Sequence, residues 1–175
     1  MTVPTRSAAA RERTALPVTS RAAAPTIRLA TADDLDALVA LEYAAFASDQ
    51  AERRAIRHAI RSASMTVLVA LADDRPGSEI LVAAATLERR RGTHSSRLSS
   101  IAVSPTRTGS GLGGIMLEAA ERDARSHGCK TLRLEVRSDN GAGIRLYERH
   151  GYVRFAVIPD YYEDGMEAWR YEKAL

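Results

Sequence analysis

The stretch RTGSGLGGIM, residues 107–116, holds four glycines within six residues and then runs directly into an apolar helix pattern. Gly109, Gly111 and Gly114 spell Gly-x-Gly-x-x-Gly, the pattern of dinucleotide-binding loops. The first turn of a helix offers unpaired backbone N–H groups to a phosphate, and glycine lets that backbone approach closely. The stretch therefore predicts a loop that binds NAD, a loop that binds another phosphate ligand, or a purely structural turn.

The residues on both sides of this loop disfavour NAD. In a dinucleotide-binding fold the loop follows its strand almost at once, and further parallel strand–helix units come after it. Here residues 104–108 separate the loop from a predicted strand that ends at Val103, and only 61 residues follow Gly114. Those residues end in two predicted antiparallel strands, which a second dinucleotide-binding half would not contain.

Hydrophobic periodicity and turn residues predict a mixed α/β domain whose first strands are antiparallel. The predicted strands cover residues 26–30, 65–72, 79–90, 95–103, 130–137, 152–158 and 167–175, and the predicted helices cover residues 31–46, 48–62, 114–128 and 140–151. The turn DDRPGS, residues 73–78, joins two of these strands into a hairpin.

Length and charge indicate one electrically neutral folded domain. A chain of 175 residues suits a single domain. Of its 25 basic and 22 acidic residues, four arginines and one glutamate precede Ile27, so the rest of the chain carries equal numbers of both signs. A nucleic-acid-binding domain normally carries its basic excess on the folded part. The charge pattern therefore disfavours nucleic acid as a partner.

Residues 1–25 are rich in Ala, Arg, Ser, Thr and Pro, which predicts a disordered basic tail ahead of a domain at 26–175. The tail lacks the apolar run of a secretory signal, and its composition is faintly similar to an organelle transit peptide. The single cysteine, Cys129, excludes an internal disulfide and fits a reducing compartment such as the cytoplasm; we expect it to be a small buried apolar residue. The sequence contains no metal-binding pattern and no apolar run long enough to span a membrane.

Two segments resemble the GNAT superfamily of N-acetyltransferases. IAVSPTRTGSGLGGIMLEAAERDAR, residues 101–125, is similar to the segment that binds acetyl-CoA in that family: a strand, a bend with proline, Arg/Gln-x-x-Gly-x-Gly/Ala and a helix. LEVRSDNGAGIRLYERHGY, residues 134–152, resembles the second segment, with its Asn, its Leu-Tyr and its Gly-Tyr. Together with DYYEDG, residues 160–165, these segments resemble the ribosomal-protein alanine N-acetyltransferase (RimI-like) branch.

The resemblance implies a GNAT fold, a mixed and mostly antiparallel central sheet flanked by about four helices. It also implies an enzyme that transfers acetyl from acetyl-CoA, without a metal, to the N-terminal α-amine of a protein or peptide. Two alternatives stay open: an acetyltransferase for small amines such as polyamines, amino acids or antibiotics, and a non-catalytic sensor that binds acyl-CoA. We expect a monomer or a homodimer.

The resemblance assigns cofactor contacts to two strand-and-loop segments and one side chain. The backbone of Ile101, Ala102 and Val103 would contact the pantetheine arm, and Asn140 would contact the same arm from the other side. The pyrophosphate would lie in the loop made by Gly109, Ser110, Gly111, Leu112, Gly113 and Gly114.

One departure from the family pattern concerns the side chain that normally helps to hold the pyrophosphate. The Arg or Gln of the family falls on Thr108, and Arg107 is displaced by one position. The backbone donors of residues 109–114 are unaffected, so we expect weaker cofactor binding unless Arg107 replaces the missing contact.

The resemblance also names catalytic and acceptor residues. Glu135 matches the general base, although a strand carboxylate paired with Arg133 or Arg137 is an alternative. Tyr147 matches the general acid, since a phenol holds its proton at neutral pH and can donate it to a departing thiolate; it could also simply cap the core. Tyr161 and Tyr162 would shape the acceptor site. An α-amine costs roughly 1 kcal/mol to deprotonate at pH 7 and a lysine about 4–5 kcal/mol, so a modest base suffices for an N-terminus.

Overall fold

The computed structural model describes residues 24–75 and 78–175, so most of the predicted tail, residues 1–23, lies outside the described residues. The described chain forms seven strands, four α-helices and two short 3₁₀ turns. In chain order these are β1 Thr26–Leu29, a 3₁₀ turn Ala32–Asp34, α1 Leu35–Ala45, α2 Arg53–Arg61, β2 Met65–Arg75, β3 Ser78–Arg89, β4 Ser95–Val103, a 3₁₀ turn Pro105–Arg107, α3 Leu112–Ser126, β5 Thr131–Arg137, α4 Gly141–Arg149, β6 Val153–Ile158 and β7 Ala168–Ala174.

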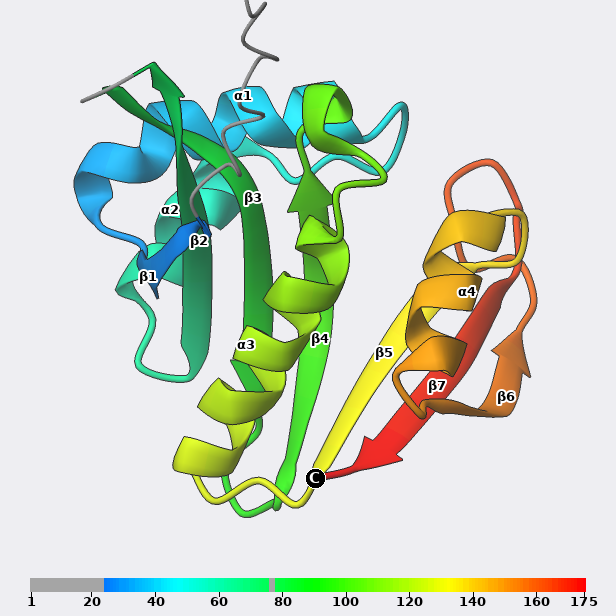
Figure 1. Ribbon diagram of the computed structural model, residues 1–175. Coiled ribbons are helices and arrows are strands. Elements are labelled where there is room, and N and C mark those ends of the chain that lie inside the picture. The colour runs from blue at the N-terminus through cyan, green and yellow to red at the C-terminus, as the bar shows by residue number, and fades with distance from the viewer. Residues whose placement is uncertain (1–23, 76–77) are drawn as a thin grey trace, which may run out of the picture.

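The strands form one sheet in the order β1-β2-β3-β4-β5-β7-β6. Every neighbouring pair is antiparallel except β4 and β5, which run parallel. Helices α1 and α2 cover one face of the sheet, and α3 and α4 cover the other (Figure 1). The predicted mixed, mostly antiparallel sheet with four helices is confirmed.

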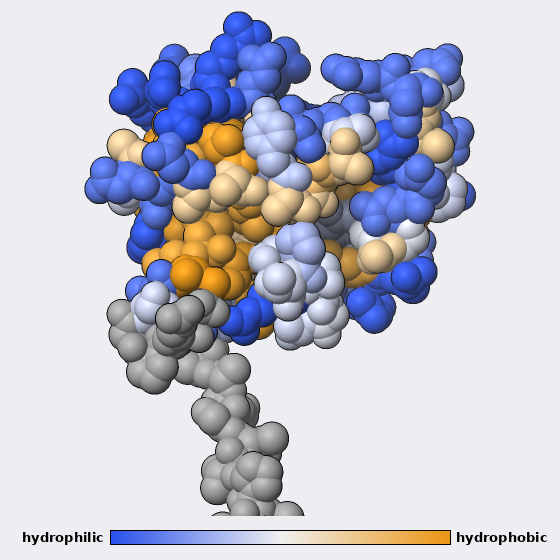
Figure 2. Space-filling model, turned by 90° about the horizontal axis from the view of Figure 1, so that it is seen from above, coloured by the Kyte–Doolittle hydropathy of each residue, from blue (hydrophilic) through white to orange (hydrophobic). Residues whose placement is uncertain are grey.

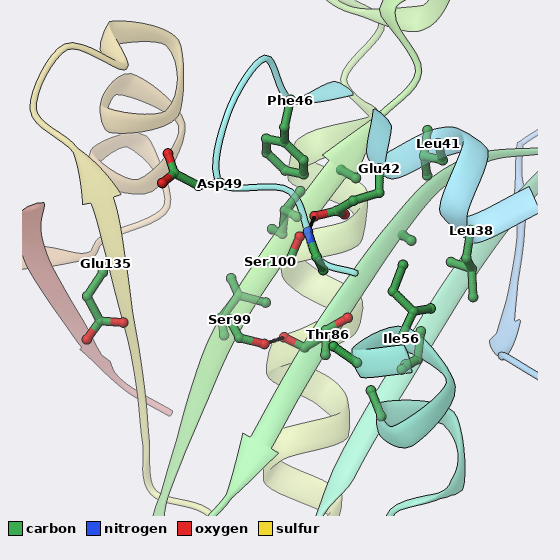
Figure 3. A pocket seen from close by; sticks show the side chains of 18 of the residues that line it. Leu38, Leu41, Glu42, Phe46, Asp49, Ile56, Thr86, Ser99, Ser100 and Glu135 are labelled. Carbon is green, nitrogen blue, oxygen red and sulfur yellow. Dashed lines mark hydrogen bonds between the residues drawn. The ribbon is translucent and has the colours of Figure 1, made fainter. Parts of the chain in front are cut away.

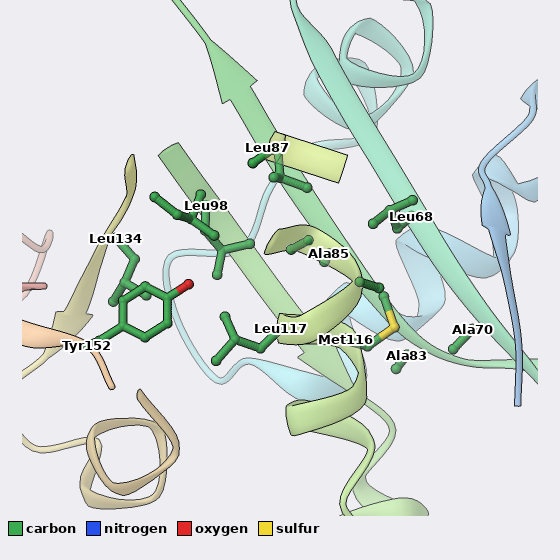
Figure 4. Packing of buried hydrophobic residues seen from close by; sticks show 14 of the residues in the cluster. Leu68, Ala70, Ala83, Ala85, Leu87, Leu98, Met116, Leu117, Leu134 and Tyr152 are labelled. Atoms are coloured by element: carbon green, nitrogen blue, oxygen red, sulfur yellow. The ribbon is translucent and has the colours of Figure 1, made fainter. Parts of the chain in front are cut away.

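Each face of the sheet has its own core. On one face α3 buries Met116 and Leu117 against Leu87 and Leu98 of the sheet, and Tyr152 closes this larger cluster beside β5 (Figure 4). On the other face, α1 buries Leu38 and Leu41 in a smaller cluster. Cys129, only 7% exposed, belongs to the larger cluster, which confirms the expectation of a buried apolar residue.

The predicted start of the second helix at Ser48 is wrong, because α2 begins at Arg53. Asp49 has a positive φ of 56°, a conformation that a right-handed helix excludes. The buried carboxylate of Glu42 accepts the backbone N–H of Ala51 at 2.9 Å, so a side chain of α1 satisfies a group that a longer helix would have used. Residues 46–52 therefore form a loop between α1 and α2.

An ion pair ties the first strand to the turn before α1. Arg28 donates two hydrogen bonds, of 2.7 and 2.8 Å, to the carboxylate of Asp34, which also accepts the backbone N–H of Thr31. The hydrogen bond from Arg28 is the largest cause that lowers the pKa of Asp34 from 3.8 to about 2, and burial opposes it. The folded state therefore stabilises the charged carboxylate.

Replacing Asp34 by asparagine is expected to lower the free energy of unfolding by about 1–2 kcal/mol at neutral pH. Because the pKa of Asp34 is lower in the folded state, its contribution is full above about pH 4 and is lost as the pH falls through about 2. Urea unfolding at several pH values measures both effects. Asp33→Asn, at an exposed position of the same turn, is the control, and an equal loss in both variants would contradict this role.

Candidate active site

Strands β4 and β5 separate after a short parallel pairing. They pair over four residues each, Ser95–Leu98 with Thr131–Leu134, and then diverge (Figure 1). The separation begins where the register between β3 and β4 shifts: Leu98 and Ser100 face consecutive residues of β3, so Ser99 is an extra residue in β4. Such a bulge bends its strand and redirects the side chains around it. The sheet is therefore open between β4 and β5 without being broken elsewhere.

The backbone of β4 turns polar groups into this opening. The N–H of Ser104 donates to the carbonyl of Val82 in β3, and successive residues of a strand direct their backbone groups to opposite sides. Ile101 and Val103 therefore direct theirs away from β3, toward β5. Ala102 pairs with Ala84 of β3 and buries its side chain, so two of the three predicted backbone contacts face the opening.

A cavity of about 370 Å³ passes through this opening. It joins residues of α1 and α2 on one face of the sheet to Asn140 and Tyr147 on the other. Figure 3 shows Glu135 on one side of this space and Leu38, Leu41 and Ile56 on the other. Two predicted catalytic residues, Glu135 and Tyr147, thus line one cavity.

The carboxylate of Glu135 lies between two guanidinium groups. Arg97 Nε donates to one oxygen at 2.7 Å, and Arg170 Nε donates to the other at 3.2 Å. The side chain of Glu135 is 8% exposed. The alternating pattern of β5 is confirmed, because Leu132, Leu134 and Val136 are buried on its opposite face.

The predicted alternative partners of Glu135 are wrong. Arg133 pairs instead with Glu172, and Arg137 pairs with Asp49, Asp139 and Asp164. The partners that Glu135 does have come from β4 and β7, the strands on either side of β5. Neighbouring strands can supply such partners at any sequence distance, which the pattern along β5 alone does not reveal.

Tyr147 of α4 lines the cavity and also packs against the larger core cluster. Its half-buried ring packs edge-on against Tyr152, with the ring centres 5.9 Å apart. Burial, and to a smaller degree the neighbouring Tyr162, raises the pKa of Tyr147 to about 12. The phenol therefore keeps its proton throughout the neutral range.

The loop between β6 and β7 brings Tyr161 and Tyr162 to different places. Tyr162 lines the cavity, and the guanidinium of Arg137 lies over its ring, 4.8 Å from the centre. Tyr161 does not line the cavity; it is 40% exposed, and its hydroxyl accepts a 3.0 Å hydrogen bond from Arg97. Arg97 thus contacts both the carboxylate of Glu135 and the loop that carries the two tyrosines.

The glycines of the opening stretch serve two purposes. Gly109 and Gly111 have positive φ values of 77° and 86°, and open space lies where a Cβ would stand. Gly111 precedes α3 and has no side chain to cap it, so within the described part of the chain the N–H groups of the first helical turn are left without a capping partner. A Cβ on Gly113 or Gly114 would instead approach α4, at 3.3 Å from Leu146 or 3.1 Å from His150.

The two residues that precede the glycine loop, Arg107 and Thr108, differ in whether their side chains are available to a phosphate. The hydroxyl of Thr108 donates to the carbonyl of Pro105 and is therefore committed within the loop. Arg107 has no salt bridge to any residue that the structure describes. The guanidinium of Arg107 therefore lies beside the loop without an acidic partner from the described chain. In the family pattern the corresponding Arg or Gln stands one residue later, at position 108.

Asn140 has a structural duty besides its predicted one. It precedes α4, and its carbonyl oxygen accepts the N–H of Gly143 at 2.9 Å, which caps the helix. The same side chain lines the cavity, where its amide N–H groups are donors.

Sequence patterns missed four residues of the site. Arg97 and Arg170 hold Glu135, while Asp49 lies across from Arg137 at 3.0 Å and Glu42 forms part of the cavity wall. None of them belongs to a recognisable motif. Among the described residues no group of His, Cys, Asp and Glu is arranged to hold a metal ion, and no helix is long and apolar enough to cross a membrane.

Comparison with known proteins adds a family to this geometry. The model of the acetyltransferase (GNAT) family matches residues 32–152. A stretch of 72 residues is 40% identical to the ribosomal protein bS18-alanine N-acetyltransferase of Escherichia coli strain K12, and it makes up 40% of this chain and 49% of that relative. The chain therefore matches the curated relative over about half of that relative's length.

Two solved structures share the fold over nearly their full length. The ribosomal-protein-S18-alanine N-acetyltransferase from Escherichia coli has a TM-score of 0.74 at 26% identity and covers 86% of this chain and 93% of its own. The NatC complex bound to Gag peptide and CoA has a TM-score of 0.75 at 18% identity and covers 87% of this chain and 99% of its own. At that identity the second likeness concerns the fold alone.

Proposed function

The chain belongs to the acetyltransferase (GNAT) family, and on that premise we propose that it transfers acetyl from acetyl-CoA to the N-terminal α-amine of a protein or peptide. The observation that carries the proposal is the cavity between β4 and β5, which brings Glu135 and Tyr147 to one space beside the open edge of β4. The names of the Escherichia coli relatives, both alanine N-acetyltransferases, support the class of acceptor.

The residues present fit coenzyme A. The N–H groups of the first turn of α3, with Arg107 close by in sequence, suit a pyrophosphate. The open backbone of Ile101 and Val103 and the amide of Asn140 suit the polar pantetheine arm on either side. The cofactor supplies an activated acetyl thioester. The related fold of the NatC complex with CoA is consistent with this fit.

The side chains of the cavity would move two protons. Glu135 would accept a proton from the acceptor amine, and Tyr147 would donate its proton to the departing thiolate. An N–H of the open β4 edge, such as that of Val103, would polarise the thioester carbonyl. Arg97 and Arg170 occupy one lone pair on each oxygen of Glu135, so another on each is left for the amine or for an intervening water.

Replacing Gly111 by alanine is expected to weaken acetyl-CoA binding about tenfold. A Cβ meets no atom there, but a residue with a side chain pays roughly 1–2 kcal/mol for its positive φ, and relaxation would turn the first-turn N–H groups away. Calorimetric titration measures the Kd. Gly92→Ala is a matched control, since Gly92 has a φ of 75° in the distant turn between β3 and β4 and also has open space. A similar loss of affinity in both variants would contradict the proposed role of the loop.

The proposed function is tested with acetyl-CoA and short peptides. Calorimetry first measures acetyl-CoA binding, and thiol release is then followed with peptides whose N-termini are free or blocked and with small amines. Turnover that requires a free peptide N-terminus would support the proposal. Turnover on small amines alone would instead indicate a small-molecule acetyltransferase. Binding of acetyl-CoA without any turnover would indicate an acyl-CoA sensor.

A further inference from the structure

The cavity has an apolar compartment that the proposed chemistry does not use. On the side away from Glu135 it lies beneath α1 and α2, where Leu38, Leu41 and Ile56 face it. Met65 and Val67 of β2 line the same compartment from the sheet. These side chains belong to the smaller core cluster or pack against it, so the compartment is a gap within an apolar layer.

The polar groups of this compartment carry no positive charge. Among the described residues that line the cavity, Arg137 is the only cationic one, and it stands on β5 with its own acidic partners. On the α1 side the carboxylate of Glu42 is buried and already accepts the N–H of Ala51; burial raises its pKa. An acidic side chain would therefore lose water here without gaining a counter-ion, whereas an apolar side chain would gain from burial.

The compartment and the predicted base lie at opposite ends of one space. In Figure 3, Glu135 stands on β5, Ser99 and Ser100 lie between, and Leu38 and Ile56 stand opposite. The cavity thus runs without interruption from Glu135 past the two serines to α1 and α2, a path open to the side chain of an amine held next to Glu135. The whole cavity measures about 370 Å³, more than twice the roughly 150 Å³ that holds benzene in an engineered apolar cavity, and the compartment shares this volume with the space beside Glu135.

We propose that this compartment binds the first side chain of the acceptor, and that the enzyme prefers N-termini beginning with a bulky apolar residue, such as leucine or methionine, over those beginning with alanine or serine. This inference rests on the proposed function and specifies its substrate class. Seen from above, hydrophobic residues gather on the left part of this face, with polar residues around its rim (Figure 2).

The preference is measured with peptides that differ only in their first residue. One methylene in an apolar pocket is worth about 10- to 200-fold in kcat/KM, so leucine is expected to exceed alanine by at least about tenfold. Calorimetry with CoA present should give the same order for peptide Kd. Equal use of leucine and alanine peptides, or preference for alanine, would overturn the inference while leaving the proposed function intact. Absence of turnover on every free N-terminus would overturn both.

Acyl-CoA donors of different chain length test whether the compartment holds the acceptor's first side chain or the acyl chain of the donor. If the compartment receives the first acceptor side chain, hexanoyl-CoA should react with the leucine peptide far more slowly than acetyl-CoA. Equal rates with the two donors would mean that the acyl chain fills the compartment and would overturn the inference.

Substitutions on α2 test the location. Ile56→Phe fills part of the compartment with a larger side chain and is expected to lower the leucine-to-alanine ratio of kcat/KM at least about tenfold, the lower end of the value of one methylene. Ile60→Phe, one turn further along α2, is the matched control: Ile60 packs against the same core cluster but does not line the cavity, so the ratio should stay unchanged. Because each ratio compares two substrates of one protein, partial unfolding cancels. An unchanged ratio in Ile56→Phe would overturn the inference.

Discussion

Replacement of Tyr147 by phenylalanine is expected to lower kcat by about 10²–10⁴ while the Kd for acetyl-CoA stays within about twofold. Only the phenolic hydroxyl is lost, and general acid catalysis by one positioned group is worth that much. The ring still packs against Tyr152, so the fold should be kept. Stopped-flow or steady-state measurement of thiol release gives kcat, and calorimetry gives the Kd.

Tyr152→Phe is the matched control for this variant. It removes a hydroxyl from a buried tyrosine directly behind Tyr147, and Tyr152 does not line the cavity. Its kcat should remain near that of the unmodified protein. Since the pKa of Tyr147 is about 12, loss of this proton should not lower kcat between about pH 6 and 10. Full activity of Tyr147→Phe would end the assignment of Tyr147 as the acid.

Glu135→Gln is expected to lower kcat/KM at pH 7 by about 10²–10⁴, because the amide cannot accept the amine proton. A free α-amine that is already neutral needs no base, so in this variant kcat/KM should rise about tenfold per pH unit up to a pH near 8, the ordinary pKa of an α-amine. The rise in the unmodified protein should be weaker. A pH series of initial rates with one free peptide measures the difference.

Glu135→Gln should also lower the free energy of unfolding. The carboxylate of Glu135 accepts hydrogen bonds from two guanidinium groups, one on each oxygen, whereas the amide has only one oxygen that can accept. Loss of a hydrogen bond to a charged group costs about 1.5–3 kcal/mol, and the half-exposed Arg97 keeps the loss at the lower end. Glu172→Gln is the control, since Glu172 pairs with Arg133 on the same face of the sheet and does not line the cavity. If Glu172→Gln lost as much turnover, the effect of Glu135→Gln would be structural.

Local pattern was sufficient to predict the order of the elements and several features of the site. Alternation along β5 placed Glu135 opposite Leu134, and the glycine-rich stretch predicted a turn that leads into α3. These features depend on residues two to four positions apart, for which backbone geometry gives fixed rules. The family resemblance added the names of the cofactor and catalytic residues, which remain proposals.

The rest of the site depends on contacts between distant residues. Arg97 is 38 residues from Glu135, and Asp49 is 88 residues from Arg137. Which side chains meet at such distances depends on strand order and on the bulge in β4, and neither follows from periodicity. The prediction of where α2 begins was wrong for the same reason. The carboxylate of Glu42, nine residues before Ala51, accepts the N–H of Ala51 and helps to hold the loop that precedes α2. The apolar compartment likewise requires the packing of two helices on the sheet.

The close approach of α3 and α4 couples the position of the glycine loop to the position of Tyr147. Gly113 and Gly114 are the last residues of the proposed phosphate-binding loop, and the side chains of Leu146 and His150 that lie next to them flank Tyr147 in sequence. A methyl group added at Gly114 would require the imidazole of His150, which is hydrogen-bonded to the carbonyl of Leu146, to shift by a few tenths of an ångström. The absence of side chains at these two glycines thus lets α3 pack close to α4, and this packing sets the distance between the proposed phosphate-binding loop and Tyr147. A larger residue at 114 would be tolerated only together with a smaller one at 150, so these two positions should vary as a pair.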